Sequence, residues 1–216
     1  MALLDLLVPP ACSGCGTYGE ALCRRCRSSF RPAGTPLDRF VAPDPGVVVG
    51  DDLQVAVAAF TYEGVLRRTL ARLKYGGASR LARPLAEAAA PLLVDFAARH
   101  GGASLVPVPV HPERLRQRGY NQAALLARHF AVEWAAEVAD VLVRSRPTSQ
   151  QHRLNRAERL RNLRGAFGLR AEARAPPVAL LVDDILTTSA TLEACAAVLR
   201  AAGSERVVGI AIAREV

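Results

Sequence analysis

The pattern of apolar and polar positions divides the chain into a short cysteine-bearing start, a segment without periodicity, and a long region of alternating elements. From about residue 55 onward, short apolar runs typical of strands alternate with stretches in which apolar residues recur every three or four positions, as in helices. The predicted strands are Val55–Thr61, Ser104–Val110, Val141–Arg144, Ala166–Leu169, Val178–Asp183 and Val207–Ala213. The predicted helices are Gly64–Tyr75, Ala82–Arg99, Asn121–Val138 and Thr191–Ala202. This alternation predicts an α/β domain, a mostly parallel sheet flanked by helices, over residues 55–216.

The composition is that of a folded protein. Half of the 216 residues are hydrophobic, which is enough for a buried core and excludes a disordered chain, a collagen and a disulfide-dense mini-protein. No stretch approaches the roughly 20 apolar residues that a membrane span requires, so we expect no membrane insertion. The start, MALLDLLVPP, has no basic residue before its short apolar stretch and makes a poor signal peptide. We therefore predict a cytoplasmic protein.

Four of the five cysteines form the pattern C-x2-C-x7-C-x2-C: Cys12, Cys15, Cys23 and Cys26. Each C-x2-C pair can offer two thiolates to one metal ion, and two pairs complete the closed tetrahedral set typical of structural zinc. Two disulfides or a redox pair are the alternatives, but disulfides require an oxidising compartment, which the poor signal peptide does not indicate. The fifth cysteine, Cys195, lies in a helical run and is interpreted as a core residue.

The segment after the cysteines is rich in proline and glycine and shows little periodicity. Such a composition is typical of a linker. We therefore divide the chain into a four-cysteine module over residues 1–35, a linker over residues 36–54 and an α/β domain over residues 55–216.

The net charge of +8 depends almost entirely on arginine, since Lys74 is the only lysine among 28 basic residues. Residues 144–174 carry nine arginines against Glu158 and Glu172, a net charge of +7. A run of one sign is usually a solvated face or a mobile loop. Because arginine also binds phosphate through paired hydrogen bonds, an anion-binding surface is the alternative interpretation.

An acidic pair, Asp183 and Asp184, follows the apolar run Val178–Val182, and a helix is predicted shortly afterwards. The residues between include four hydroxyl side chains close to a helix N-terminus, where backbone N–H groups suit a phosphate. Adjacent carboxylates cannot bind that phosphate, but they can accept hydrogen bonds from a vicinal diol such as a ribose. A helix cap is the alternative, although a cap needs only one such residue. The segment does not match the Walker P-loop pattern.

The segment around the acidic pair, VALLVDDILTTSAT, resembles the phosphoribosyl-pyrophosphate (PRPP) motif of type I phosphoribosyltransferases. Over nearly the whole chain, the order of motifs resembles that of the ComF family. The segments that carry this resemblance are CSGCGTYGEALCRRC, AAFTYEGVLRRTLARLKYGG, LVPVPVHPERLRQRGYNQAALLA and RPTSQQHRLNRAERLRNLRGAF. That family couples an N-terminal zinc ribbon to a phosphoribosyltransferase domain. The resemblance implies a type I phosphoribosyltransferase fold with a small N-terminal zinc-binding module.

For the acidic segment, the resemblance implies that Asp183 and Asp184 are the catalytic pair and hold the ribose hydroxyls of PRPP. It implies a PRPP-binding turn for the 5′-phosphate, formed by Leu186, Thr187, Thr188, Ser189, Ala190 and Thr191. The family pattern reads TTGAT, so Ser189 stands where a glycine would let the backbone approach phosphate or take a positive φ. The loss of this glycine is expected to weaken phosphate binding by the backbone, and the Ser189 hydroxyl is the alternative group that could bind the phosphate.

Three further segments have implied roles at the pyrophosphate of PRPP. Residues 107–121 match the family's pyrophosphate loop, in which Arg114 and Arg118 would bind the leaving group; the residues alone also fit the basic start of a helix. Lys74 falls in the family's LKYxG pattern and is a further PRPP-binding candidate, although a lone lysine is usually a surface residue. Residues 144–174 match the hood loop that closes over PRPP, and the positions that fit the family spacing are Thr148, Gln151, Arg159 and Asn162.

Two functions from different classes are compatible with these features. The first is an enzyme that transfers ribose 5-phosphate from PRPP, with Mg²⁺ as a second metal beside structural zinc, to an acceptor for which no motif is found. The second is a catalytically inactive module that binds single-stranded DNA, or docks on a competence helicase, through the same phosphate site. The family's association with DNA uptake and natural transformation favours the second by analogy. Against it, aromatic residues make up only 5% of the chain, so platforms for base stacking are scarce.

Overall fold

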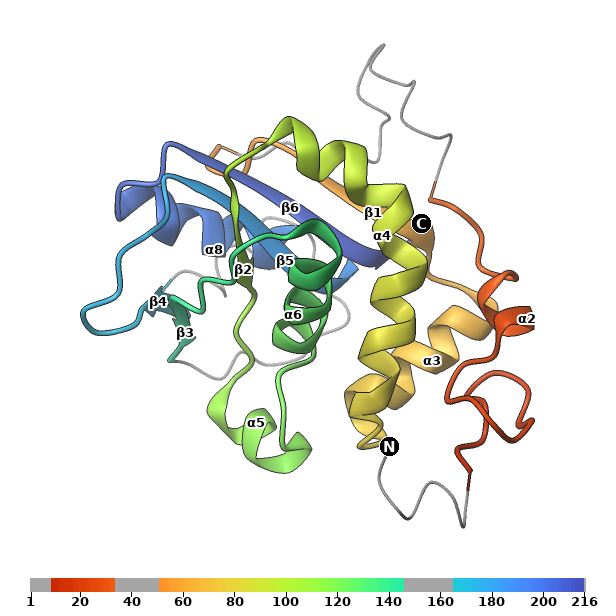
Figure 1. The fold of residues 1–216 in the computed structure, drawn as a ribbon. Coiled ribbons are helices and arrows are strands. Elements are labelled where there is room, and N and C mark those ends of the chain that lie inside the picture. The colour runs from red at the N-terminus through yellow and green to blue at the C-terminus, as the bar shows by residue number, and fades with distance from the viewer. Residues whose placement is uncertain (1–8, 34–50, 146–164, 216) are drawn as a thin grey trace.

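The computed structural model describes residues 9–33, 51–145 and 165–215, which form an α/β fold with the cysteine-bearing residues at one side (Figure 1). The strands are β1 (Ala56–Thr61), β2 (Ser104–Pro107), β3 (Leu142–Arg144), β4 (Phe167–Leu169), β5 (Val178–Leu186) and β6 (Arg206–Arg214). The helices are α2 (Arg24–Arg27), α3 (Gly64–Tyr75), the 3-10 helix η1 (Ser79–Leu81), α4 (Ala82–Arg99), α5 (Pro112–Arg118), α6 (Gln122–Trp134) and α8 (Ala190–Ala201). Within these ranges, no helix has both the length and the apolar character that crossing a bilayer would require.

Four parallel strands form the central sheet in the order β1-β6-β5-β2. β5 is an inner strand, and its Val182 is paired with Ile210 of β6 on one side and with Pro107 of β2 on the other. Residues on both faces of β5 and β6 are buried, which explains why these strands read as continuous apolar runs. The predicted α/β class is confirmed, and the carboxyl ends of all four strands meet at one edge, where such sheets bind ligands.

Helices cover both faces of this sheet (Figure 1). α4 and α6 lie on one face, where Leu126 and Phe130 belong to the same buried cluster as Val182. α8 lies on the other face, where Cys195 shares a buried cluster with Leu181. Neighbouring residues of β5 therefore contribute to different core layers, as the alternation of side chains along a strand requires. Cys195 is fully buried, as predicted for a core residue.

Several element boundaries differ from the sequence prediction for identifiable reasons. α6 ends at Trp134 because Ala135 adopts a left-handed conformation with φ 50°, and Val138 then pairs with Leu105 of β2. β2 ends at Pro107, and the basic residues that follow it form the helix α5, which confirms the helix-start interpretation of that segment. β5 continues to Leu186 because β6 pairs with it that far.

A second, antiparallel pair of strands, β3 and β4, lies apart from the main sheet. Its Arg144 guanidinium lies over the ring of Phe167, with the carbon of the guanidinium 5.3 Å from the ring centroid. Most of the residues that connect the two strands, residues 146–164, fall outside the described ranges, and they carry six of the nine arginines of the basic run. The hood-loop positions predicted there therefore stay predictions: Thr148, Gln151, Arg159 and Asn162.

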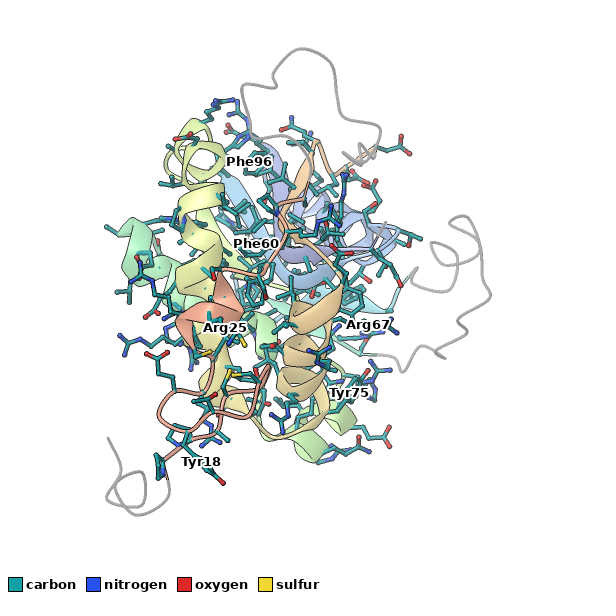
Figure 2. The ribbon with its side chains drawn as sticks, turned by 90° about the vertical axis from the view of Figure 1, so that its right-hand side faces the viewer. Tyr18, Arg25, Phe60, Arg67, Tyr75 and Phe96 are labelled. Carbon is teal, nitrogen blue, oxygen red and sulfur yellow. The ribbon has the colours of Figure 1, made fainter. Side chains whose placement is uncertain are left out.

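The described residues of the cysteine module (residues 9–33) pack against α3 and α4, as Figure 2 shows from that side. Phe30 of the module meets Phe60 of β1 edge-on, with ring centroids 5.2 Å apart. Arg27 forms an ion pair with Glu87 of α4, at 3.2 Å. The buried residues of the module belong to the same hydrophobic cluster as those of α3 and α4.

The segment predicted as a linker, residues 36–54, falls mostly outside the described ranges. Its last residues are described and are held by the α/β domain. Leu53 is fully buried, and the N–H groups of Asp52 and Leu53 donate to the carboxylate of Glu193 on α8, at 3.0 and 3.2 Å. The division into a module, a linker and a domain stays a prediction.

Candidate functional site

The four module cysteines lie together, with all four Sγ atoms within 4.8 Å of one another. Cys15 and Cys23 are the pair joined by a sulfur–sulfur contact of 3.7 Å. All five cysteines of the chain are among the described residues, and none forms a disulfide. A tetrahedral zinc ion with Zn–S distances of about 2.3 Å would hold its sulfurs about 3.8 Å apart. The cluster therefore has the ligands and the size that a zinc ion requires.

Backbone donors favour the thiolate form of one member of this cluster. Burial alone would raise the pKa of Cys12, but backbone N–H groups of Cys23, Cys15 and Gly14 donate to its sulfur and lower the pKa to about 6. Burial and the neighbouring thiols instead raise the pKa of Cys26 to about 12. Four thiolates this close repel one another, so a bound cation would stabilise the arrangement. With four protein ligands, the cluster leaves no open position for catalysis.

Glycine at position 14 is required by close packing around the cluster. A Cβ on Gly14 would lie 2.6 Å from Sγ of Cys26 and 2.7 Å from Cγ1 of Val65 on α3. Both distances are far below van der Waals contact, so the first cysteine turn approaches its partner thiol and α3 through bare backbone.

Both residues of the acidic pair lie inside β5, which continues to Leu186 and not only to the predicted end at Asp183. Asp184 is buried, and its Oδ2 lies 3.1 Å from Nζ of Lys74 at the end of α3. Asp183 is half-buried, and its Oδ1 accepts a hydrogen bond from the N–H of Asp184, at 2.8 Å. Because both residues belong to a paired strand, their carboxylates are held by the sheet itself at its carboxyl edge.

Burial and neighbouring charges shift the pKa values of Asp183 and of Lys74. Burial and then the charge of Asp184 raise the pKa of Asp183 to about 8, although Lys74 acts in the opposite direction. For Lys74, burial lowers the pKa, but the charges of Asp184 and Asp183 outweigh it and raise the pKa above the usual lysine range. The site therefore has an excess of acid, which a metal ion or hydrogen-bond donors of a ligand would stabilise.

The C-terminal turn of α3 contacts two other predicted segments. Lys74 binds Asp184, as described above, and the ring of the next residue, Tyr75, lies under the guanidinium of Arg118 at 5.0 Å. The hydroxyl of Tyr120 donates to the carbonyl oxygen of Leu73, at 2.6 Å. The structure thus joins the segments around Lys74, Arg118 and Asp184, although they lie far apart in the sequence.

The segment predicted as the pyrophosphate loop leaves β2 and returns to its end. Asn121 closes it: its Nδ2 donates to the carbonyl of Val108, and its Oδ1 caps α6 by accepting from the N–H of Ala123, both at 3.0 Å. Arg118 is further oriented by a hydrogen bond to Gln122, at 3.0 Å. Arg114 lies elsewhere on α5, on the side of Arg144, whose pKa is lowered by burial and then by the charge of Arg114.

The PRPP-binding turn predicted from the resemblance connects β5 to the first turn of α8. Ser189 is the N-cap residue of α8 and has a left-handed backbone, with φ 54° and ψ 0°. Its buried hydroxyl donates to the carbonyl of Thr188, at 2.6 Å. The positive φ accounts for the glycine in the family pattern, and here a serine takes the same conformation at an energetic cost.

Sequence reasoning did not assign contacts to Tyr75 and Tyr120. Their partners, Arg118 and Leu73, lie more than 40 positions away in the chain. Only their places within the two matched family segments could have drawn attention to them. The partners themselves follow from how α3 and α5 pack.

Comparison with known proteins finds no family model that matches the chain. Competence protein F of Haemophilus influenzae is 28% identical over 207 residues, which cover 92% of this chain and 82% of the relative. DNA utilization protein YhgH of Salmonella typhi is 30% identical over 208 residues, covering 91% of this chain and 86% of the relative. Competence protein ComFC of Streptococcus pneumoniae is 27% identical over 157 residues, covering 73% of this chain and 67% of the relative.

Proposed function

The chain belongs to the ComF family of competence and DNA-utilization proteins, and on this basis we propose that it binds PRPP or a related ribose 5-phosphate ligand and acts in DNA uptake. The observation that carries the proposal is the convergence of Lys74, Arg118 and the acidic pair of β5. They lie at the carboxyl edge of a parallel sheet, the usual ligand position in such folds. Cations and carboxylates side by side suit a ligand that carries both phosphates and hydroxyls.

The acidic pair would bind the sugar of this ligand. Carboxylates accept hydrogen bonds from a vicinal diol, and the raised pKa of Asp183 indicates a position where an added donor or cation stabilises the ionised form. The turn from Leu186 to Thr191 would hold the 5′-phosphate, because it leads into the N-terminus of α8, where backbone N–H groups and the helix dipole favour an anion.

The pyrophosphate of PRPP would lie toward α5 and the end of α3. In the transfer, an acceptor attacks C1 of the ribose, and pyrophosphate departs with the electron pair of the broken C–O bond. Arg118 and Arg114 would stabilise the negative charge on the leaving group by position and electrostatics. Mg²⁺ bound with the pyrophosphate would supply further charge neutralisation, and the excess acid at Asp183 and Asp184 is compatible with a cation there.

For the cysteine module, the proposal includes a structural zinc ion held by Cys12, Cys15, Cys23 and Cys26. The supporting observations are the mutual distances of the four sulfurs and the backbone N–H donors to Cys12. Bound zinc would stabilise the cysteine module, which is too small to form a sufficient hydrophobic core of its own. Metal analysis of protein purified under reducing conditions tests this part, and finding no zinc would refute it.

Titration calorimetry with PRPP and Mg²⁺ tests the ligand site. We expect heat with the natural sequence, and a loss of affinity of at least tenfold in the Asp183→Asn/Asp184→Asn double variant, since a tenfold change is about 1.4 kcal/mol. Asp140→Asn changes an exposed aspartate that pairs with Arg170 beside the strands β3 and β4; it is the matched control and should bind as the natural sequence does. An absence of heat with the natural sequence would exclude PRPP as the ligand.

A second candidate function, binding of single-stranded DNA, is favoured by one specific observation. Tyr18 and Tyr75 are 72% and 68% exposed, and Figure 2 shows both on one face together with Arg25 and Arg67. Exposed aromatic rings among arginines can stack on bases and bind the backbone of a single strand. Titration of fluorescent single-stranded DNA at several salt concentrations tests this function. A log–log slope near zero would show that the arginines do not contact phosphates.

A further inference from the structure

One short helix, α3, contacts the cysteine module along its first half and the acidic pair at its end. From this arrangement we propose that the cysteine module is a positioning part of the ligand site, which acts through α3 to hold Lys74 against Asp184. The contacts that carry the proposal need no ligand. That the positioning serves PRPP binding rests on the proposed function.

The first contact is a hydrogen bond between two hydroxyl groups, one from the half-buried Ser13 of the module and one from the middle of α3. Oγ of Ser13 lies 3.0 Å from Oγ1 of Thr69, a fully buried residue. Thr69 donates its single hydroxyl hydrogen to the carbonyl of Val65, at 2.9 Å, so Ser13 must be the donor to Thr69. Ser13 therefore adds a hydrogen bond from the module to a hydroxyl group that water does not reach, which makes the position of the module relative to α3 specific.

The second contact is the close approach of the first cysteine turn to the same helix. The backbone at Gly14 leaves no room for a Cβ between Sγ of Cys26 and Cγ1 of Val65. The backbone of Gly14 therefore lies between the thiol of Cys26 and Val65 of α3, so a displacement of this cysteine turn would act on the helix. Val65 and Thr69 are one helical turn apart, so both contacts act on one face of the helix.

The far end of α3 lies one turn beyond Thr69. There the carbonyl of Leu73 accepts from Tyr120, Lys74 binds Asp184, and Tyr75 lies under Arg118. From Thr69 to Lys74 the helix rises only about 7.5 Å, at 1.5 Å per residue. A shift at Thr69 is therefore transmitted to Lys74 by a continuous stretch of helix.

α3 depends on tertiary contacts for its position. It has 12 residues, its N-cap Glu63 makes no side-chain capping bond among the described residues, and its first turn contains no acidic residue. A helix of that length is marginal in water without packing partners. Loss of the module contacts should therefore loosen the whole helix, including the turn that carries Lys74.

The single lysine of the chain makes the proposal measurable without any ligand. The rate at which an amine-reactive ester modifies Lys74, followed by peptide mass spectrometry to separate it from the N-terminal amine, reports how well the ammonium group is held by Asp184. We expect slow modification of the zinc-loaded protein. In the Thr69→Val variant, which keeps the shape and the thiols but removes the hydroxyl, we expect modification at least about fivefold faster, the lower end of typical coupling between sites.

Removal of zinc with a chelator is the second perturbation, and it should accelerate modification by at least as much. The matched control is Glu87→Ala, which breaks the module's ion pair to α4 and leaves the contacts to α3 intact. Circular dichroism verifies that each sample is folded. If the chelated sample is unfolded, the Lys74 modification rate of Thr69→Val alone tests the proposal. Equal rates in Thr69→Val and the natural sequence would overturn the proposal. So would a Glu87→Ala rate as high as that of Thr69→Val, since the module would then act only through overall stability.

A PRPP titration separates this inference from the proposed function. If PRPP binds the natural sequence, Thr69→Val should bind it at least about fivefold more weakly, and unchanged affinity would contradict the positioning role. If PRPP does not bind the natural sequence, the proposed function fails, while the Lys74 modification rates still decide whether the module positions α3.

Discussion

Nζ of Lys74 lies 3.1 Å from Oδ2 of Asp184, and this contact joins the end of α3 to the carboxyl edge of the sheet. Only 3% of the Asp184 side chain and 21% of the Lys74 side chain are exposed, so water contributes little to stabilising either charge. Removing one partner of such a pair leaves an uncompensated buried charge, which usually costs more than the pair itself contributes.

The Lys74→Met substitution is therefore expected to destabilise the fold by about 3 kcal/mol. Urea denaturation measures the effect. Arg72→Met, at an exposed position on the same helix, is the matched control and should change stability by no more than about 0.5 kcal/mol. Adding Asp184→Asn to Lys74→Met should recover part of the loss, because the unpaired charge is then removed. Equal stability of Lys74→Met and Arg72→Met would show that the contact between Lys74 and Asp184 does not contribute to the stability of the fold.

Asp183 should make the fold less stable as the pH rises. Its folded pKa is raised to about 8, above an unfolded value of about 3.9, so the folded state favours the protonated form. The stability that this preference provides is fully present below pH about 4 and is lost as the pH rises toward 8. Asp183→Asn removes the titration, so at pH 8 it should be more stable than the natural sequence.

Urea denaturation of both proteins at pH 5 and pH 8 checks the sign of this effect. The gain from Asp183→Asn should be larger at pH 8 than at pH 5, and Asp140→Asn, on an exposed residue, should show no such difference. A larger gain at pH 5 would contradict the raised pKa. If PRPP binding also depends on Asp183, the natural sequence sacrifices stability at this position for function.

Replacing Ser189 with glycine should stabilise the turn before α8. Serine at φ 54° is strained, and the relief outweighs the extra conformational freedom that glycine has in the unfolded chain, for a net gain of about 0.5–1 kcal/mol. Ser189→Ala keeps the strain and loses the hydrogen bond to Thr188, so it should be no more stable than the natural sequence. Thermal unfolding of the three proteins distinguishes them. A midpoint for Ser189→Gly below that of the natural sequence would show that the hydrogen bond of the serine hydroxyl outweighs the relief of backbone strain.

Helix boundaries were predictable where glycine follows the helix. α3 and α4 match their predicted bounds, because Gly76 and Gly77 follow the first and Gly101 and Gly102 the second. The end of β5 was not predictable in this way. Two aspartates have low strand propensity, but pairing with β6 through Leu186 keeps them in the strand.

In the candidate site, too, some features follow from the local sequence and others only from the packing of distant segments. Spacing within the chain is sufficient to group the four cysteines and to single out Asp183 and Asp184. The contact of Lys74 with Asp184 joins residues 110 positions apart, and only the packing of α3 against the sheet brings them together. The four-cysteine cluster is thus local chemistry that a single sequence reveals, whereas the Lys74–Asp184 pair is a property of the fold.

The cysteine cluster should not tolerate a side chain at position 14. In Gly14→Ala the new Cβ would lie 2.6 Å from Sγ of Cys26 and 2.7 Å from Cγ1 of Val65, and neither atom can move without disturbing the thiol cluster or α3. We expect lower zinc content after purification under reducing conditions and faster zinc loss to a chelator, measured with a zinc-sensitive dye. Gly101→Ala is the matched control, since its φ is not positive and its Cβ would meet nothing closer than the Ala98 carbonyl oxygen at 3.4 Å. Zinc retention in Gly14→Ala equal to that of Gly101→Ala would show that the thiols bind metal without the close approach seen here.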